Sequence, residues 1–450
     1  MPATSPFPER ASAARGAPRR PGRRTSPARP AASGLAPAVV TIVGVLLVAA
    51  AMRAPITSVG PLLETIRADV GLSATSGGAL SMLPLLAFAG VSPLAPALAR
   101  RLGLERALGT ALVLLVVGTL LRSGPGTAAL FGGTVLIGVG IGLINVLLSG
   151  LVKRDFPHRV AALTGVYTTV MSGSAMIASG LAVPVATVAP GGWRTSLAVW
   201  VGFAAVGAAV WLRRPAGQGT PPAVPATTAG AAAGAGTGGP GTAGMGTPGG
   251  APATAGAGRP PRSVWRSGLA WQLTLFFGLQ SMGFYAAITW LAAILHSRGM
   301  SMATAGWYVA LMQLTGLVTS AATPLLMRRR PDQRLLAAGA ALLGMASYLA
   351  LVVAPGPALL WSATLGLGQG ASVTLALSFF ALRARDPAQA AALSGMAQSL
   401  GYVLASLGPL VFGALHDLTG DWTVPLLLIS GLIGLQGVVA LGAGRDRYVR

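Results

Sequence analysis

The sequence predicts an all-α membrane protein with twelve transmembrane helices arranged as two six-helix repeats. Its 450 residues are 53% hydrophobic and only 9% charged, whereas soluble domains carry about 25% charged residues. Apolar runs of about 18 residues or more, long enough to cross a bilayer as a helix, recur along nearly the whole chain. A Gly/Ala/Pro-rich stretch divides these runs into two blocks. A β-barrel is excluded because its strands alternate over about ten residues.

Each block contains six apolar spans. In the first block they cover residues 36–62, 76–97, 107–123, 127–150, 161–188 and 195–212. In the second they cover residues 267–295, 303–327, 335–354, 358–382, 389–413 and 423–442. The spans predict an N-terminal six-helix bundle over 35–213 and a C-terminal one over 265–443.

The remaining segments predict tails and a linker. Residues 1–34 are rich in arginine and precede an apolar run too long for a signal peptide, so we expect a disordered, basic cytoplasmic tail. Residues 214–264 are dominated by Gly, Ala, Pro and Thr, which is typical of a flexible linker. Residues 444–450 form a second short cytoplasmic tail.

The placement of charge predicts the topology. The net charge is +22, and most of the 32 basic residues fall in the tails, in the linker or in alternate loops. The positive-inside rule then places both termini in the cytoplasm, with the helices in the plasma membrane. This alternation explains the positive charge, so nucleic acid is not an expected partner. The exceptions are Arg53, Arg67, Arg122, Arg194 and Arg298.

The two blocks look like copies of one another. ARRLGLERAL (99–108) is similar to MRRRPDQRLL (327–336), and GVGIG (138–142) to GLGQG (366–370), both at an offset of 228. AALTG (161–165) is similar to AALSG (391–395) at an offset of 230. Six spans per repeat give a parallel repeat about an axis along the membrane normal. Twelve-helix secondary transporters have this organisation, with the substrate site near the midplane between the halves.

Local motifs resemble a known transporter family. The loop LARRLGLERAL (98–108) resembles the major facilitator superfamily signature between the second and third helices. The resemblance implies a cytoplasmic charge cluster of Arg100, Arg101, Glu105 and Arg106. In the family an acid precedes the first arginine of this signature, whereas this chain has Arg100.

A narrower resemblance is carried by TSVGPLL (57–63), VKRDFPHR (152–159), GWRTSLAVW (192–200) and LSGMAQSLGYVLASLGPL (393–410). These segments resemble the CynX/NimT branch of cyanate permease-like and nitroimidazole transporter-like carriers. In that branch the first helix often reads Asn-Leu-Arg-Pro, whereas this chain has Ala-Met-Arg-Ala over 51–54. The resemblance implies the major facilitator fold and a small anion or small polar organic solute as substrate.

Arg53 is the first candidate for substrate binding. It lies inside a long apolar segment, where an arginine costs about 2.5–3.5 kcal/mol on insertion scales. The repeat offset of 228 places Ser281 at the equivalent position, so the fold accepts a neutral residue there. One interpretation is a fixed cation whose planar donor fork binds an anionic or polar solute. The other is an arginine that snorkels to the headgroups. Pro55, Gly60 and Pro61 predict a bend in this span, with a helix that ends near residue 55 as the alternative.

Further polar side chains lie within apolar spans, where they normally face the protein interior. We assign Asn145, Gln280, Tyr285 and Gln398 to the site, with hydrogen bonding between helices as the alternative role. Gln313 and Gln369 share this pattern without being assigned. Glu64 is the one acid that could reach the cavity as a proton carrier, and a solvated residue at a helix end is the alternative.

The sequence therefore predicts a secondary transporter for a small anion or small polar organic solute, working by alternating access. Efflux of a neutral drug-like compound by the same fold is an alternative. A non-transporting membrane receptor is an alternative from another class. An enzyme is disfavoured because the chain has no cysteine, three scattered histidines and no cluster of acids. We expect a monomer in the lipid bilayer with no cofactor and no metal.

Overall fold

A computed structural model describes residues 35–91, 94–213, 264–328 and 332–449. The tail expected at 1–34 and nearly all of the linker expected at 214–264 lie outside these residues, as do Arg329, Arg330 and Arg450. The chain divides into two compact units, Met1–Val40 and Thr41–Arg450. The described part of the first unit is the beginning of the first helix. All contacts discussed below lie within the second unit.

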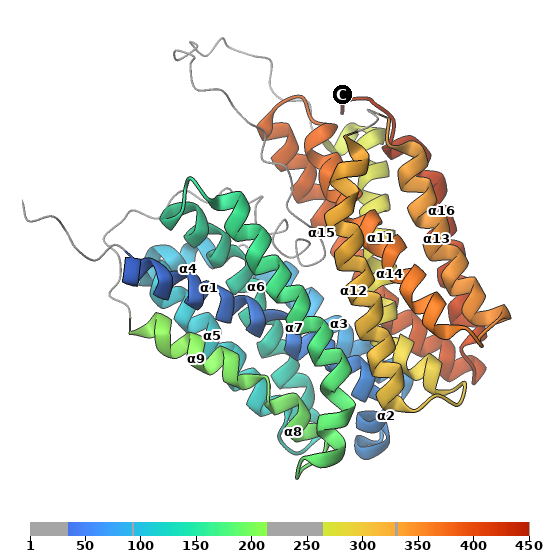
Figure 1. The fold of residues 1–450 in the computed structure, drawn as a ribbon, viewed down its shortest axis with the longest axis horizontal. Helices are drawn as coiled ribbons and strands as arrows, with labels where there is room; N and C mark the ends of the chain where they lie inside the picture. The colour runs from blue at the N-terminus through green and yellow to red at the C-terminus, as the bar shows by residue number, and fades with distance from the viewer. Residues whose placement is uncertain (1–34, 92–93, 214–263, 329–331, 450) are drawn as a thin grey trace, which may run out of the picture. The chain divides into compact units, whose positions relative to one another are not determined.

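The described residues form helices joined by short connections (Figure 1). The N-terminal half contains α1 (Leu35–Thr57), α2 (Val59–Val70), α3 (Ala74–Val91), α4 (Ala95–Leu102), α5 (Leu104–Arg122), α6 (Thr127–Asp155), α7 (Val160–Val188), α8 (Trp193–Ala198) and α9 (Val201–Leu212). The C-terminal half contains η3 (Val264–Arg266), α11 (Gly268–His296), α12 (Met302–Met327), α13 (Arg334–Val353), α14 (Ala358–Leu382), α15 (Pro387–Thr419) and α16 (Thr423–Ala443).

The helices confirm the predicted all-α membrane fold. Among the described residues, 11 helical segments are long and apolar enough to cross a membrane, and the stretch Ala74–Phe88 of α3 is a shorter apolar helix. Together they account for the twelve predicted spans. Two spans are interrupted within the described residues, since α1 and α2 form the first and α8 and α9 the sixth. The second span comprises α3 and α4, which lie on either side of residues 92–93, outside the described residues.

The interruption of the first span follows from its prolines. Pro55 lies inside α1 and provides no backbone donor, and the helix ends two residues later at Thr57. The chain resumes as α2 after Ser58, with Pro61 in its first turn, where a missing N–H costs no hydrogen bond. The first span therefore has a break at Ser58 and extends to Val70, beyond the expected end at 62.

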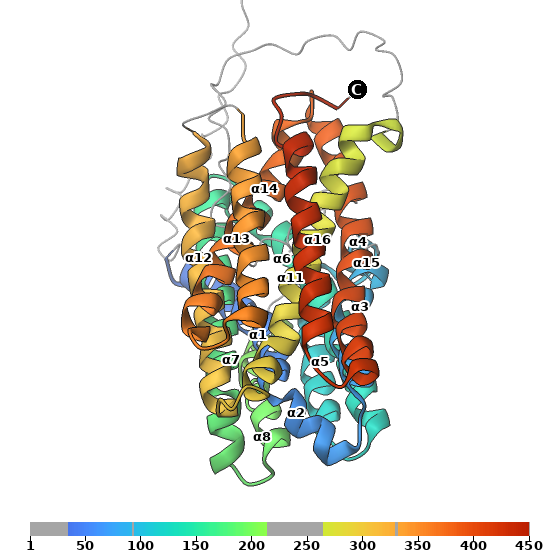
Figure 2. The same ribbon diagram turned by 90° about the vertical axis from the view of Figure 1, so that its right-hand side faces the viewer.

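The packing of the helices follows the repeat. In the N-terminal half α5 packs against α6 and α9, and in the C-terminal half α13 packs against α14 and α16. The two halves meet mainly where α3 contacts α15 and α7 contacts α12, with α2 against α11 (Figures 1 and 2). The first two of these contacts are equivalent under the repeat, because α3 corresponds to α12 and α7 to α15.

The glycine runs show the same register in both halves. At Gly138, Gly142, Gly366 and Gly370 an added Cβ would collide with, or press closely on, the neighbouring helix. The contacts pair Gly138 with Pro84, Gly142 with Phe88, Gly366 with Met312, and Gly370 with Gly316. Each glycine of the first run lies 228 positions before its equivalent in the second run, and the residues that the glycines contact are related by the same offset. Absence of a side chain therefore allows close helix approach at equivalent positions.

Candidate solute-binding site

Two cavities meet at Arg53, between the two halves of the molecule. The first comprises about 420 Å³ of space that no atoms fill and the second about 390 Å³, and both volumes include space open to solvent. The first is lined from the N-terminal half by Arg53, Ser172 and Ala175, and from the C-terminal half by Phe284, Met312, Gln313, Gly316, Leu317, Gly366, Gln369 and Gly370. The second is lined by Met52, Arg53, Ile56, Thr57, Phe88, Ile141, Asn145, Met171, Tyr285 and Ile288. Arg53 lines both.

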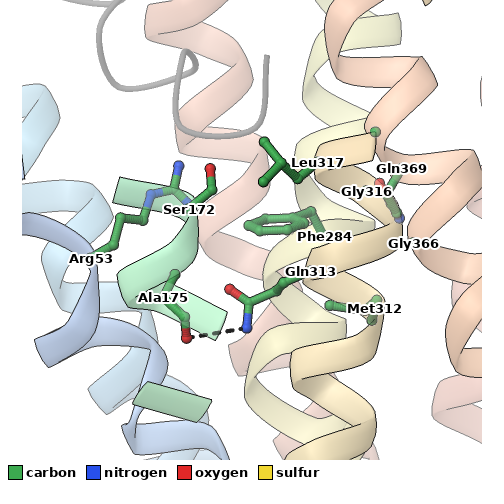
Figure 3. Close-up of a pocket in the computed structure, with 11 residues that line it drawn as sticks. Arg53, Ser172, Ala175, Phe284, Met312, Gln313, Gly316, Leu317, Gly366 and Gln369 are labelled. Atoms are coloured by element: carbon green, nitrogen blue, oxygen red, sulfur yellow. Dashed lines mark hydrogen bonds between the residues drawn. The ribbon is translucent and has the colours of Figure 1, made fainter. Parts of the chain in front are cut away.

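Arg53 extends from α1 toward the C-terminal half. Its guanidinium carbon lies 5.9 Å from the centroid of the Phe284 ring on α11, within reach of a cation–π interaction (Figure 3). Ser172 lies beside it on α7 (Figure 3). The side chain is only partly buried. A charged donor fork beside an aromatic face suits a planar solute that carries negative charge.

Two of the other predicted residues lie in the second cavity. Asn145 from α6 and Tyr285 from α11 line it together with Arg53. Asn145 is only 6% exposed. These two side chains offer an amide and a hydroxyl, which can donate to a polar solute or accept from it.

Gln280 and Gln398 line neither described cavity. The Oε1 atom of Gln280 accepts a hydrogen bond from Ser281 Oγ at 3.2 Å. Gln398 Nε2 donates to Ser394 Oγ at 2.6 Å, one turn earlier on α15. Ser281, the repeat partner of Arg53, also lies outside both cavity linings and is 4% exposed. The structure therefore brings together Arg53, Asn145 and Tyr285 but not these two glutamines.

In the lining of the first cavity, four polar or aromatic residues were not assigned to the site from the sequence. They are Ser172, Phe284, Gln313 and Gln369. The two glutamines share the signal used for Asn145, a polar side chain in an apolar span. Phe284 carries no such signal because a phenylalanine in a span is ordinary packing. Gln313 also connects the halves. Its Nε2 donates to the Ala175 carbonyl at 3.4 Å (Figure 3) and to Ser179 Oγ at 2.8 Å.

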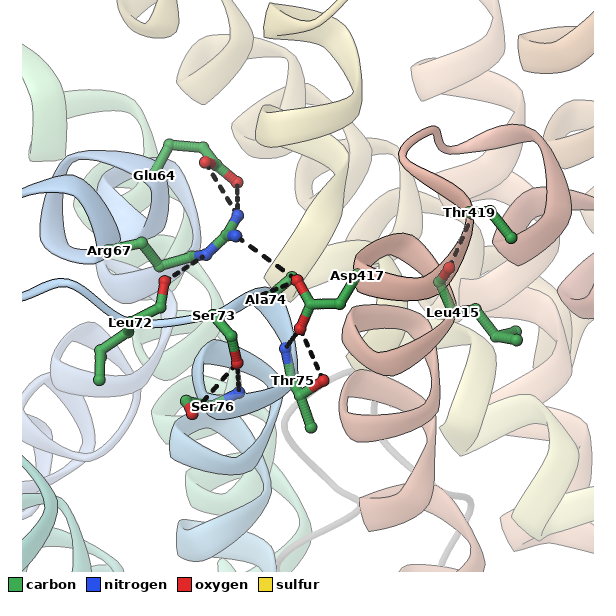
Figure 4. Close-up of polar contacts among 10 residues, drawn as sticks. All are labelled: Glu64, Arg67, Leu72, Ser73, Ala74, Thr75, Ser76, Leu415, Asp417 and Thr419. Carbon is green, nitrogen blue, oxygen red and sulfur yellow. Dashed lines mark hydrogen bonds and ion pairs between the residues drawn. The ribbon is translucent and has the colours of Figure 1, made fainter.

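Glu64 lies on α2, outside both cavity linings. Its carboxylate accepts two hydrogen bonds from Arg67 Nη1, at 2.7 and 3.0 Å. Arg67 Nη2 also lies 3.9 Å from the carboxylate of Asp417 on α15 (Figure 4). Glu64 is therefore part of an ion-pair network that reaches the C-terminal half.

Asp417 forms the polar contact between the halves at this end. Its carboxylate accepts hydrogen bonds from the backbone N–H groups of Ala74 (2.9 Å) and Thr75 (2.7 Å), and from Thr75 Oγ1 (2.7 Å) (Figure 4). An acid from the C-terminal half thus caps the first turn of α3 in the N-terminal half, where the helix dipole favours a negative charge. We refer to Asp417, Arg67 and the start of α3 as the latch.

The predicted charge cluster has a different set of contacts. Glu105 at the start of α5 is 5% exposed and accepts a hydrogen bond from Arg154 Nη2 of α6 at 2.5 Å. Arg154 Nε also donates to Asp155 at 2.6 Å. Arg100, Arg101 and Arg106 are exposed. Glu105 is thus bound by Arg154, which lies in the last turn of α6.

Comparison with known proteins decides the family. The model of the Major Facilitator Superfamily matches residues 42–406. The chain belongs to the major facilitator superfamily. It is 41% identical to a 2-nitroimidazole transporter of Escherichia coli (strain K12) over 417 residues, covering 92% of this chain and 97% of that protein. It is 27% identical to the cyanate transport protein CynX of the same organism, covering 86% and 94%.

Solved structures show the same fold. The crystal structure of a bacterial homologue of the human lysosomal transporter Spinster, inward-facing and occupied, superposes with a TM-score of 0.70 at 11% identity. The match covers 91% of this chain and 98% of that structure. The family, the relatives and the helices confirm the predicted fold class and the CynX/NimT resemblance. The protein is a multi-pass membrane protein of the plasma membrane, and a secondary transporter of small solutes rather than an enzyme.

Proposed function

We propose that this transporter moves a small anion or small polar organic solute, and that Arg53 binds it. The observation that carries the proposal is the position of Arg53 in the lining of two cavities that both contain residues from each half. A solute bound there contacts both halves at once. Alternating access requires such a site, because the solute must be reachable from either side as the halves rock.

The relatives support the same substrate class. One is named for 2-nitroimidazole and another for cyanate, a planar nitro compound and a small linear anion. An arginine fork and a nearby aromatic ring suit both kinds of solute. Asn145 and Tyr285 provide neutral polar groups in the same space. Gln280 and Gln398 remain assigned only as polar residues that could reach the site after a conformational change.

Orientation and assembly belong to the same proposal. The basic residues near the ends of α4, α6 and α12 support a cytoplasmic location for that side of the molecule and for both termini. The latch then lies on the outer side, at the end where α2 and α8 are found (Figure 2). Contacts between the halves at this end support a conformation that is closed to the outside. We propose a monomer as the working unit, without nucleic acid as a partner.

The test is solute flux into proteoliposomes. Wild type, Arg53→Gln and Arg298→Gln are compared with cyanate and with 2-nitroimidazole, each with and without a pH gradient. Arg298 is a control because it is exposed in the loop after α11. We expect Arg53→Gln to lower cyanate flux at least about tenfold, the effect of losing about 1.4 kcal/mol. Unchanged cyanate flux in this variant would overturn the assignment of Arg53 to the site, and absence of flux for both probes would support the receptor alternative.

Glu64 is our candidate for proton coupling. Its carboxylate binds Arg67 within α2, and Arg67 also reaches Asp417 of the C-terminal half, so proton binding to Glu64 would change the charge of the ion-pair network where the halves meet. We expect Glu64→Gln to remove any stimulation of flux by a pH gradient while leaving flux down a solute gradient. A stimulation of the same size in this variant would assign coupling to another group.

A further inference from the structure

The buried arginine Arg122 has no role in the site described so far. It is the last residue of α5, lies within an apolar environment, and is 1% exposed. Its Nη1 atom donates to the carbonyl oxygen of Pro55 at 2.6 Å. Its Nε and Nη2 atoms are buried and have no hydrogen-bond partner among the described residues. No described acid forms an ion pair with it.

Fold stability alone gives little reason for such a residue. Burying a charged group without an opposite charge is costly, and each unsatisfied donor adds about 1–3 kcal/mol. A neutral side chain with one donor could make the same bond to Pro55. Buried charges that are kept despite this cost are a mark of function in membrane-spanning helices.

The bond to Pro55 lies at the break in the first span. Pro55 is two residues after Arg53 and three before Ser58, where α1 gives way to α2. Arg53 lies little more than one helical turn before this break, so the way α1 and α2 join there bears on the position of Arg53 in the cavities. The break contains another orphan group, because Ser58 Oγ is buried without a described partner.

On its other side, the break is tied to the cavity. Thr57 Oγ1 donates to the carbonyl of Ala175 at 3.0 Å and to that of Arg53 at 3.2 Å. Ser179 Oγ donates to the carbonyl of Thr57 at 3.2 Å. Gln313, which lines the first cavity, donates in turn to Ser179 Oγ at 2.8 Å. A path of hydrogen bonds therefore runs from the cavity, through α7, to the break.

We infer that Arg122 is a positioning residue for solute recognition. By binding the Pro55 carbonyl it fixes the bend of the first span, against the anchors that Thr57 and Ser179 provide on the opposite side. This bend holds Arg53 in both cavities. The inference rests on the proposed role of Arg53 in binding the solute, and it assigns Arg122 no contact with the solute itself.

The bend can be measured independently of transport. The chain has no cysteine, so spin labels can be placed at single introduced cysteines. Val43 on α1 and Thr65 on α2 are exposed and flank the break. They are 22 residues apart, about 33 Å if the helix were straight. We expect Arg122→Met to shift or broaden the distance distribution between these labels in lipid nanodiscs, and Arg122→Lys to restore part of the wild-type distribution.

Transport provides the second readout. We expect Arg122→Met to raise the KM for cyanate about tenfold, with a smaller effect on the maximal rate and on 2-nitroimidazole. Arg122→Lys should recover cyanate affinity in part, which a loss of general stability would not predict. Arg298→Gln should match wild type in both measurements. Thr57→Val, which keeps the side-chain volume and removes the hydroxyl, tests the opposite anchor and should act in the same direction if Arg122→Met does not fold.

The outcomes separate this inference from the proposed function. An unchanged distance distribution in folded Arg122→Met would overturn the inference, and so would a changed bend with unchanged KM for cyanate. If Arg53→Gln itself leaves cyanate uptake unaltered, the proposed function fails. In that case the distance distribution alone decides whether Arg122 holds the bend.

Discussion

At the scale of single residues, several arginines lie either where the two halves meet or beside the break in the first span. Arg53 lies in the linings of two cavities, Arg122 binds the carbonyl of Pro55, and Arg67 lies between Glu64 and Asp417. These are three of the five basic residues that the positive-inside pattern does not explain. A fourth, Arg194 in the first turn of α8, forms an ion pair of 2.8 Å with Asp69 on α2. Basic residues outside the topology pattern are thus used mostly for specific contacts.

A conservative change at Arg53 tests the geometry of its donors. Lysine keeps the positive charge but replaces the planar fork with a single point of donation. We expect Arg53→Lys to keep measurable cyanate uptake, with a KM between those of wild type and Arg53→Gln. Uptake kinetics in proteoliposomes measure this order. A lysine variant equal to the glutamine variant would show that the fork, not the charge, carries recognition.

At the scale of helices, small residues set how closely neighbours approach. An added methyl at Gly366 would meet the Met312 carbonyl oxygen and Thr315 Oγ1 of α12. At Gly431, on α16, an added methyl meets nothing within 4 Å. The cavity lies against the first of these contacts, because Gly366 and Met312 both line it. Helix spacing and cavity shape are therefore linked at this point.

We expect Gly366→Ala to destabilise the protein by about 1–3 kcal/mol, since the overlap forces α12 and α14 apart. Gly431→Ala is the matched control, and it should be neutral or stabilising by up to about 1 kcal/mol because alanine favours the helix. Thermal unfolding in detergent compares the two. Equal melting temperatures would mean that the contact between α12 and α14 adjusts without cost.

The C-terminal segment after α16 packs against the end of α14, on the side of the molecule proposed to be cytoplasmic. Arg383, 2% exposed, donates to the Gly444 carbonyl at 2.9 Å and to Asp446 at 3.2 Å. Burial lowers the pKa of Arg383, and Asp446 opposes this effect. The Val449 amide donates to the Arg383 carbonyl at 2.8 Å. Arg383 comes directly after α14, and Arg154 lies at the end of α6, the equivalent helix of the N-terminal half. Arg154 pairs with Glu105, whereas Arg383 pairs with Asp446 of the C-terminal segment.

Substitutions at two adjacent residues test whether this C-terminal segment packs against the rest of the protein. Val449 is fully buried, whereas Tyr448 is 55% exposed. We expect Val449→Asp to lower the melting temperature, because an uncompensated carboxylate in an apolar cluster is costly. Tyr448→Ala should leave it within the error of the measurement. A Val449→Asp protein that melts like wild type would show that the segment does not dock in solution.

At the scale of the whole molecule, the latch joins the halves on the side of α2 and α3. Opening on that side requires the bonds from Ala74 and Thr75 to Asp417 to break. We expect Asp417→Asn, with a weaker acceptor and no charge, to increase the population that is open at this end. Spin labels at the partly buried Ser76 and the exposed Thr419 measure the change. A distance distribution identical to wild type would mean that other contacts hold this end closed.

Most of the fold could be predicted from the sequence, but only part of the site. The length of each apolar run is enough to predict a membrane span, and all twelve predicted spans correspond to apolar helices. The break at Ser58 could be placed only roughly, because Pro55 and Pro61 both lie in uniformly apolar sequence. Arg53, Asn145 and Tyr285 come together, but Gln280 does not join Tyr285, because five residues along a helix turn the side chain by about 140°. Gln313 and Gln369 look no different from Gln398 until the rotation of their helices is known.

The central claim is that Arg53 recognises the charge of the solute between the two halves. The ratio of initial uptake rates for cyanate and 2-nitroimidazole, measured for Arg53→Gln and wild type in the same proteoliposome preparation, tests it most directly. We predict that the ratio falls about tenfold in the variant, because uptake of the anion loses more than uptake of the neutral compound when the cation is removed. An unchanged ratio, with both solutes still transported, would contradict the claim.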